Sequence, residues 1–295
     1  MVINHLHVEA STYCNARCPG CPRNAHGVNL PNLFPLQHLS LQSYMTVLAK
    51  FPDVRSVNFN GNLGDPMMNP NILELVKASN ARCNITTNGS IGKITDFISL
   101  AKLGHEITFS IDGLEDTNHL YRQDVEWSKV MERVKAFLDN GGAGTWKWVI
   151  FRHNAQQVEQ AKIMASALGF QDFIIEDHGR NYFPACTKDG KISHWILPAS
   201  GNQQPNGNFD VEQHIKIIRK PFDIAPPKYN CKVSCEHLTG SVYISASGTV
   251  HPCCFQGFDL PDRKSVSLGE FPDIEKTWNT DDVNVICATN CKDVT

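Results

Sequence analysis

Three cysteines lie close together near the start of the chain, at Cys14, Cys18 and Cys21, in the spacing C-x3-C-x2-C. The run Ile3–Glu9 just before them alternates apolar and polar residues, which predicts a β-strand and places the cysteines on the loop after it. Three thiolates on one short loop can hold three corners of a cubic iron–sulfur cluster and leave the fourth iron open. A structural zinc ion would need a fourth ligand nearby. Zinc, or plain buried or redox cysteines, are the alternatives.

The other cysteines of this eleven-cysteine chain are distributed unevenly. Cys83 and Cys186 stand alone and are expected to be core residues. The remaining six lie in the C-terminal part, at Cys231, Cys235, Cys253, Cys254, Cys287 and Cys291. Two groups of soft ligands indicate two metal centres in a reducing compartment more readily than a set of disulfides.

Composition limits the class of protein. The chain has 295 residues, 41% of them hydrophobic, and a net charge of −3 from 27 basic and 30 acidic residues. No segment is basic enough to suggest nucleic-acid binding or an anionic membrane surface. No apolar run reaches the roughly 18 residues of a membrane span, and no signal-peptide pattern follows Met1. We therefore expect a soluble, cytoplasmic protein with neither nucleic acid nor membrane among its partners.

Strand and helix patterns alternate along the first 176 residues. The expected strands span 3–9, 55–60, 84–87, 106–112, 146–151 and 172–176, and the expected helices span 40–50, 69–77, 92–103, 127–140 and 155–168. This order predicts a parallel α/β fold, as either a barrel or an open doubly wound sheet. In both, functional residues gather where the strands end.

The cysteine loop resembles the signature of the radical S-adenosylmethionine (radical SAM) enzymes. In that family the C-x3-C-x2-C loop holds a 4Fe–4S cluster, and S-adenosylmethionine chelates the open iron. An aromatic residue usually precedes the third cysteine, whereas this chain has Gly20. The resemblance implies that Cys14, Cys18 and Cys21 bind the catalytic cluster. It also selects the barrel, as a partial (β/α)6 TIM-like barrel, over the doubly wound sheet.

Further motifs follow the second and third expected strands. The segment Asn60–Pro66 resembles the family's Gly-Gly-Glu-Pro motif, whose backbone and carboxylate receive the ammonium of S-adenosylmethionine. This assigns Gly64 and Asp65 to the cofactor, with Asp65 in place of the family's Glu. A plain Gly/Asp/Pro turn is the alternative. Asn88 belongs to a Thr-Asn-Gly segment that is common in these enzymes.

The fourth expected strand ends in a pattern similar to the family's Ser-x-Asp-Gly…Arg. The resemblance implies that Ser110 and Asp112 lie near the ribose and methionine groups, and that Arg122 pairs with the carboxylate. A guanidinium suits this task because its planar fork binds both carboxylate oxygens. An arginine on a loop can also be simply solvated.

In the C-terminal part, a hairpin is expected over 241–245 and 249–252, with a turn at Gly248. The spacing Cys235-x12-Gly248-x4-Cys253 resembles the opening of the SPASM and twitch domains, which carry auxiliary clusters. The i, i+4 spacing of Cys287 and Cys291 would place both sulfurs on one face of a helix. With Cys235 and Cys253 they complete four thiolates for a second, auxiliary 4Fe–4S cluster, with zinc as the alternative.

The expected domains are a radical SAM core at 1–185, a linker at 186–228 with a short helix near 211–219, and a small α+β twitch or SPASM-like domain at 229–295. The resemblance implies reductive cleavage of S-adenosylmethionine to a 5′-deoxyadenosyl radical, which abstracts hydrogen from a small-molecule or peptide substrate. A flavodoxin- or ferredoxin-like protein would supply the electron. Since the cysteine loop begins at Cys14, no peptide-recognition domain is expected before it, which favours a small molecule or a partner-delivered peptide. A non-catalytic zinc or iron–sulfur interaction protein and an electron carrier are the alternatives.

Overall fold

The computed structural model describes residues 2–30, 33–177, 182–200, 205, 209–218, 240–251 and 253–254. The cysteine loop and all the residues assigned to S-adenosylmethionine lie within these ranges. Of the four residues assigned to the auxiliary cluster, Cys253 is described, whereas Cys235, Cys287 and Cys291 lie outside the described residues.

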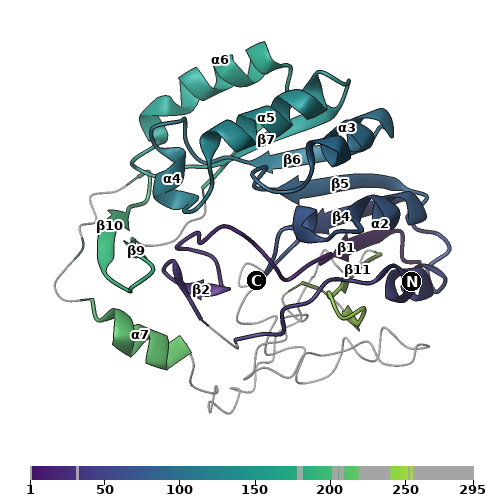
Figure 1. Ribbon diagram of the computed structural model, residues 1–295, viewed down its shortest axis with the longest axis horizontal. Helices are drawn as coiled ribbons and strands as arrows, with labels where there is room; N and C mark the ends of the chain where they lie inside the picture. The colour runs from purple at the N-terminus through teal and green to yellow at the C-terminus, as the bar shows by residue number, and fades with distance from the viewer. Residues whose placement is uncertain are drawn as a thin grey trace, which may run out of the picture.

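An eight-stranded sheet forms the centre of the molecule, in the order β12-β11-β1-β4-β5-β6-β7-β8 (Figure 1). Six strands run parallel in chain order: β1 (His5–Val8), β4 (Ser56–Asn60), β5 (Arg82–Thr87), β6 (Glu106–Ser110), β7 (Ala143–Val149) and β8 (Asp172–Glu176). These are the six strands expected from the sequence, and each pairs with the next. The predicted parallel α/β fold is confirmed.

The connecting helices pack on one face of this sheet. They are α1 (Leu41–Leu48), α2 (Ile72–Ala78), α3 (Ile94–Lys102), α5 (Trp127–Leu138) and α6 (Val158–Leu168). Tyr44 of α1 packs on Phe59 of β4, and rings from α3 and α5 pack on Phe109 of β6. A doubly wound sheet would place helices on both faces. One covered face and a sequential strand order identify a singly wound, partial barrel.

The opposite face of the sheet, called the inner face here, is polar. The strand register aligns His7, Asn58 and Asn84 in one row across β1, β4 and β5. Asn84 and Thr108 exchange hydrogen bonds of 3.1 Å in both directions. A hydrophobic core therefore fills the space between sheet and helices, whereas the inner face presents hydrogen-bonding groups.

A C-terminal hairpin extends the sheet at its β1 edge. It consists of β11 (Ser241–Ile244) and β12 (Val250–His251), as the sequence predicts, and Gly248 in its turn has a positive φ of 84°. Strand β11 runs parallel to β1, with His7 opposite Tyr243. The sheet of the barrel thus includes residues from both sides of the expected linker.

Smaller elements lie beyond the carboxyl ends of the strands. They are the hairpin β2 (Asn24–Ala25) and β3 (Val28–Asn29), the helix α4 (Asn118–Tyr121), the hairpin β9 (Phe183–Cys186) and β10 (Ile192–Ile196), and the helix α7 (Val211–Ile218). Helix α7 is the short helix expected near 211–219, whereas β10 lies in a stretch where no regular element was expected. Phe151 after β7 packs with Ala185 and Ile196, so this hairpin is attached to the barrel through an apolar cluster.

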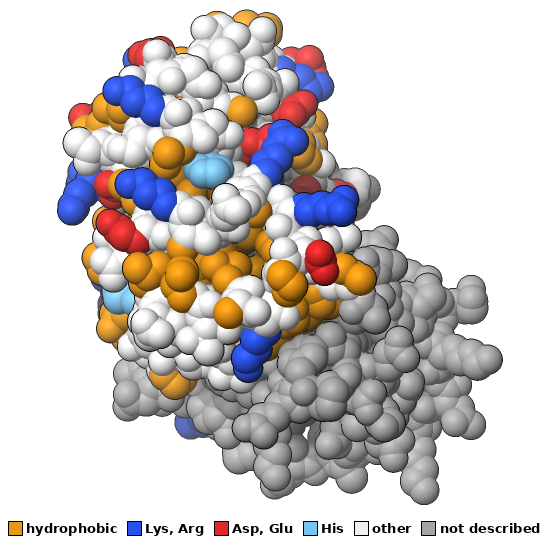
Figure 2. Space-filling model, turned by 90° about the vertical axis from the view of Figure 1, so that its right-hand side faces the viewer, with side chains coloured by type: hydrophobic (Ala, Val, Ile, Leu, Met, Phe, Trp, Pro, Cys, Tyr) orange, Lys and Arg blue, Asp and Glu red, His pale blue; other side chains and the backbone are white. Residues whose placement is uncertain are grey.

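The face of the molecule at which β4, β5 and β6 begin exposes apolar side chains. Figure 2 views this face and shows hydrophobic side chains gathered at its centre. Val2, before β1, and Leu103, before β6, are among the exposed apolar residues, at 62% and 43%.

In the part of the chain that the structure describes, no helix has the length and hydropathy of a membrane span.

Candidate active site

A pocket opens where β1, β4, β5 and β6 end. Eight of the nine described residues that the sequence assigns to the catalytic cluster and to S-adenosylmethionine line it: Cys14, Cys18, Cys21, Gly64, Asp65, Asn88, Ser110 and Arg122. They come from the cysteine loop, the loops after β4 and β5, the last residue of β6 and the end of α4. The ninth, Asp112, is fully buried and contacts the pocket through Arg122.

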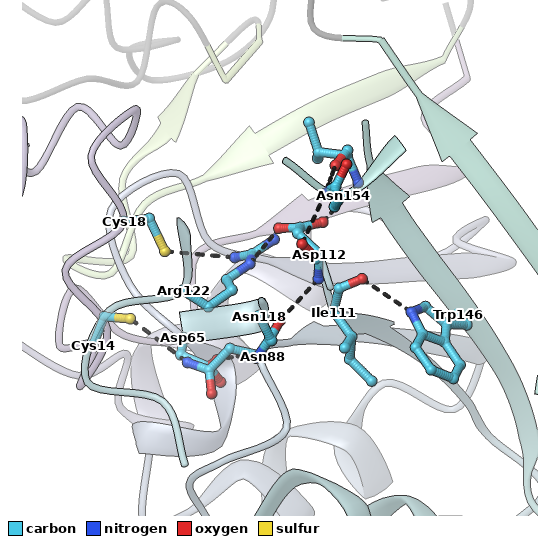
Figure 3. Close-up of polar contacts among 11 residues, drawn as sticks. Cys14, Cys18, Asp65, Asn88, Ile111, Asp112, Asn118, Arg122, Trp146 and Asn154 are labelled. Atoms are coloured by element: carbon cyan, nitrogen blue, oxygen red, sulfur yellow. Dashed lines mark hydrogen bonds and ion pairs between the residues drawn. The ribbon is translucent and has the colours of Figure 1, made fainter. Parts of the chain in front are cut away.

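Nitrogen donors approach the sulfur atoms of this pocket. The Cys14 sulfur accepts from the Ala16 backbone at 3.4 Å and from Asn88 Nδ2 at 3.8 Å. Arg122 Nη1 lies 3.7 Å from the Cys18 sulfur (Figure 3). Donors of this kind stabilise thiolate ligands and influence the reduction potential of a cluster. The Cys14 and Cys18 sulfurs therefore have the N–H donors that are typical of cluster ligands.

Burial opposes ionisation of these thiols in the absence of metal. It raises the pKa of Cys14 to about 12 and the pKa of Cys21 to about 11, and it also raises the pKa of Cys18. A bound cluster supplies the positive charge that replaces the protons. Cluster binding is thus expected to release protons.

Two arginines hold the cysteine loop in shape. Arg17 forms an ion pair with Asp124 at 2.7 Å and donates to the Gly27 carbonyl at 2.5 Å. Arg23 donates to the Cys14 carbonyl at 3.0 Å. Both stabilise the backbone of the loop, and neither was recognised from the sequence because the spacing of the motif does not indicate these partners.

Asp65 is buried, and its carboxylate is saturated by protein donors. It accepts from the Thr87 hydroxyl at 2.8 and 2.9 Å, from Asn88 N at 2.8 Å and from Met67 N at 3.0 Å. Burial raises the pKa of Asp65, while these hydrogen bonds act in the opposite direction. Asp65 therefore ties the loop after β4 to the end of β5.

Asp112 and Arg122 form a buried ion pair. Arg122 Nε lies 2.5 Å from Asp112 Oδ2, and the other Asp112 oxygen accepts from Val149 N at 2.6 Å (Figure 3). Proximity to Asp112 and Cys18 raises the pKa of Arg122 despite its burial. Asp112 thus orients the guanidinium, and Arg122 faces the pocket.

Asn88 links two of the loops. Its backbone N–H binds Asp65, and its side chain donates to Asn15 Oδ1 at 3.0 Å, inside the cysteine motif. Ser90 continues this chain of contacts by accepting from Asn15 at 2.8 Å. The loop after β5 therefore positions the first cysteine as well as lining the pocket.

Glu9 is a site residue that the sequence reasoning missed. It is 1% exposed, and its carboxylate accepts hydrogen bonds from the backbone of the loop after β4. The sequence feature that could have indicated it is the alternation of β1. His5, His7 and Glu9 occupy alternate positions, and these positions face the polar inner side of the sheet. Glu9 is the last of them before the cysteines.

The donor set suits an iron–sulfur cluster. Within the described residues, no group of three or more His, Cys, Asp or Glu side chains is arranged around a position for a single metal ion. In a cubic cluster each thiolate binds a different iron, so the sulfurs stand apart around it. Three free thiols that line one pocket and receive N–H donors fit that requirement.

Comparisons with known proteins agree with this site. The family model of the radical SAM superfamily matches residues 8–161, just over half of the chain, from the end of β1 into α6. No curated protein matches the chain.

Several solved structures share the fold at low sequence identity. SuiB of Streptococcus suis bound to S-adenosylmethionine matches with a TM-score of 0.63 at 15% identity, over 98% of this chain and 68% of that one. SuiB bound to the precursor peptide SuiA matches with a TM-score of 0.61 at 16% identity, over 99% and 67%.

A second protein, native anSMEcpe with bound AdoMet, matches with a TM-score of 0.56 at 16% identity, over 95% of this chain and 81% of that one. At such identities these likenesses establish the fold alone, and the family follows from the match of the family model together with the cysteine loop. The chain belongs to the radical SAM superfamily.

Proposed function

We propose that this chain is a radical SAM enzyme that abstracts hydrogen from a peptide or small-molecule substrate, using a 4Fe–4S cluster and S-adenosylmethionine. The observation that carries the proposal is the shared pocket. The three thiols of the family motif line it together with the loops that follow β4, β5 and β6. Membership of the family makes these two cofactors the expected occupants.

When bound and reduced, the cluster and S-adenosylmethionine together supply a 5′-deoxyadenosyl radical, which takes hydrogen from an unactivated carbon. The protein supplies binding, orientation and exclusion of water. Cys14, Cys18 and Cys21 would hold three irons, and Asn88 and Arg122 would donate hydrogen bonds to the sulfurs they already approach.

The assigned cofactor-binding residues fall into two kinds. Gly64, Asn88, Ser110 and Arg122 line the pocket and would contact S-adenosylmethionine, with Arg122 binding its carboxylate. Asp65 and Asp112 have protein donors on both carboxylate oxygens. We assign them chiefly to positioning the loop after β4 and the guanidinium of Arg122.

We also propose the auxiliary 4Fe–4S cluster on Cys235, Cys253, Cys287 and Cys291, in a twitch- or SPASM-like arrangement. Cys253 is buried and lies two residues after the end of β12 in the sequence. The carbonyl of the next residue, Cys254, accepts from Asn62 at 3.1 Å. This ligand therefore lies one residue away from a contact with the loop after β4, where a second cluster could exchange an electron with a substrate.

For the substrate, two structural neighbours were solved with peptides, SuiB with its precursor peptide SuiA and anSMEcpe with the Cp18Cys peptide. This favours a peptide over a small molecule. The polar inner face of the barrel, with Asn58, Asn84 and Thr108, would then receive the reacting residue. A flavodoxin- or ferredoxin-like reductant in the reducing cytoplasm would complete the system.

The test is the amount of iron and sulfide per chain after anaerobic reconstitution, for the wild type and for a Cys14/Cys18/Cys21→Ala triple variant. We expect about eight irons in the wild type and about four in the variant. Under reductant, 5′-deoxyadenosine should form only with the wild type. Cys83→Ala is the matched control, because Cys83 is buried between sheet and helices and should leave both readouts unchanged.

The alternatives predict different outcomes. Zinc without iron uptake would indicate a metal-binding interaction protein and refute the proposal. Loss of all iron in the triple variant, from about four per wild-type chain, would keep the enzyme and remove the auxiliary cluster.

A further inference from the structure

The loop after β4, Gly61–Gly64, is called the glycine loop here, and it folds around the carboxylate of Glu9. Asn62 N donates to Glu9 Oε2 at 2.6 Å, Leu63 N lies 3.2 Å from the same oxygen, and Gly64 N donates to Oε1 at 3.0 Å. Three successive backbone N–H groups that converge on one anion form a nest. The anion in this nest belongs to the protein itself.

The glycines of this loop are required by close packing. A Cβ on Gly61 would lie 2.1 Å from the Gly64 carbonyl oxygen and 2.7 Å from Glu9 Oε1. A Cβ on Gly64 would lie 2.0 Å from the carbonyl oxygen of Ser11, which leads into the cysteine loop. Glu9 and the two glycines therefore set the shape of the loop, and that loop lines the pocket.

Glu9 has a fourth donor, and it comes from the far end of the described chain. The hydroxyl of Tyr243 in β11 donates to Glu9 Oε2 at 2.8 Å, and Tyr243 is 2% exposed. The backbone also connects the two strands, because Glu9 N donates to the Ile244 carbonyl at 2.8 Å. Asn62 of the glycine loop reaches the same hairpin segment through the Cys254 carbonyl.

The binding of Glu9 occupies the backbone N–H groups of the glycine loop, and this determines which ligand groups the loop can bind. Because its N–H groups bind Glu9, the glycine loop cannot offer them to a ligand in the pocket that it lines, and we infer that its backbone carbonyl oxygens are the groups available. Carbonyl oxygens suit a cation, such as the ammonium of S-adenosylmethionine, and repel a carboxylate. If Glu9 no longer held the loop, its N–H groups would compete for the same space.

We propose that Glu9 is a positioning residue for S-adenosylmethionine, and that Tyr243 makes the C-terminal hairpin β11–β12 part of the cofactor site. The inference rests on the proposed function for the identity of the cofactor. It goes beyond that function because it assigns the hairpin a task at the first cluster's site, in addition to its connection with the proposed auxiliary cluster.

The test compares three variants of the full, reconstituted chain. Glu9→Gln keeps the shape but turns one acceptor oxygen into a donor, and Tyr243→Phe removes only the hydroxyl. Tyr44→Phe is the matched control, since Tyr44 is buried and its hydroxyl hydrogen bond to Ser79, at 2.7 Å, lies between α1 and the end of α2. Equilibrium binding of S-adenosylmethionine, steady-state KM and kcat, amide hydrogen exchange over residues 61–64 and thermal melting are measured for each.

We expect the dissociation constant and KM for S-adenosylmethionine to rise about tenfold or more in Glu9→Gln and about threefold to tenfold in Tyr243→Phe. The value of kcat at saturating S-adenosylmethionine should change by no more than about threefold. Hydrogen exchange over 61–64 should become faster in both variants. Tyr44→Phe should lower the melting temperature by an amount similar to Tyr243→Phe while leaving binding, KM and loop exchange unchanged.

Other results would overturn either the inference or the proposed function. If the wild type binds S-adenosylmethionine and both variants bind it as tightly, Glu9 and Tyr243 have no positioning role, and the inference is overturned while the proposed function stands. If Glu9→Gln does not fold, Tyr243→Phe decides alone. If the wild type binds no S-adenosylmethionine, the proposed function itself fails, whatever the exchange experiment shows about the loop.

Discussion

The two sides of the pocket are built differently. The thiol side, formed by the cysteine loop, presents three free sulfurs whose contacts with donors are long, at 3.4 to 3.8 Å. The carboxylate side, formed by the ends of β1, β4 and β6, contains Glu9, Asp65 and Asp112, and each of these is buried and accepts short hydrogen bonds from the protein.

This difference separates binding from positioning. The thiols are arranged for metal that arrives later, and burial keeps them protonated until it does. The three carboxylates already have their partners, so they fix loops and a guanidinium before any ligand binds. Preorganisation of this kind reduces the entropy that must be lost when the ligand binds. Changes on the thiol side should therefore affect activity most, and changes on the carboxylate side should also affect stability.

The largest expected effect is on the thiol side. Cys14→Ala should abolish 5′-deoxyadenosine formation, because the first cluster loses a ligand, while the free energy of unfolding of the metal-free protein changes by about 1 kcal/mol or less. Cys83→Ala should lower the free energy of unfolding and leave 5′-deoxyadenosine formation unchanged, since Cys83 is fully buried and does not line the pocket. Product analysis and urea unfolding of both variants check this. Equal activity in the two variants would contradict the assignment of Cys14 to metal binding.

On the carboxylate side, Asp112→Asn should have the largest effect on stability. It leaves the Arg122 guanidinium, 16% exposed, without its charged partner, and loss of one member of a buried pair costs about 3 kcal/mol or more. Glu159→Gln breaks an exposed pair with Lys162 and should change stability by no more than about 0.5 kcal/mol. Similar losses in the two variants, measured by urea unfolding, would show that the Asp112 pair does not preorganise the site.

Asp65→Asn should have an intermediate effect. The new amide group would face the donors of Thr87 and Asn88, so we expect a loss of about 2 kcal/mol in unfolding free energy and weaker binding of S-adenosylmethionine. Asp53→Asn, at an exposed position before β4, is the control and should change neither quantity. Unchanged stability in Asp65→Asn would mean that the carboxylate is not needed to join the two loops.

Per pH unit, the smallest expected change in stability is a pH dependence that is due to Glu9. Burial raises the pKa of Glu9 from 4.5 to about 7 in the folded protein, so folding favours its protonated form. This contribution to stability is fully present below about pH 4.5 and is lost as the pH rises through about 7. Its slope is at most about 1.4 kcal/mol per pH unit.

Unfolding of the wild type and of Glu9→Gln between pH 5 and pH 8 measures this contribution. The wild type should lose stability relative to the variant as the pH rises. Parallel stability curves would indicate that Glu9 keeps its ordinary pKa and that the nest of N–H groups offsets its burial.

Much of the fold was predictable because its signals are local. The strand expected over 172–176 is observed as β8 with the same bounds, and α6 ends at Leu168, where the helix expected over 155–168 also ends, with Gly169 next at a left-handed φ of 88°. One helix start was predicted too early. The helix expected over 69–77 begins at Ile72, and the side chain of Asn69 instead donates to the Ala10 and Leu39 carbonyls and joins the segment before the cysteine loop to the barrel.

The site was predictable where it consists of a motif and unpredictable where it consists of contacts. The cysteines, Ser110 and Arg122 belong to recognisable spacings, and the structure brings them to one pocket. Nothing local indicates that Glu9 will meet a tyrosine 234 positions away, or that Asp65 will accept hydrogen bonds from Thr87 and Asn88 at the end of β5. Such partners are set by strand order, which periodicity does not determine.

The parallel pairing of β11 with β1 also affects how the protein assembles during synthesis. Strand β1 meets β4 soon after both have been made, but its other edge receives β11 only after more than 230 further residues. At ribosomal rates of about 5–20 residues per second, that edge waits on the order of ten seconds or longer. A nascent chain arrested before Ser241 should therefore be more susceptible to proteolysis near β1 than one arrested after His251. The strand that leads into the cluster-binding loop would be among the last to become fully paired, so stable loading of metal is expected to follow release of the chain and not to accompany its synthesis.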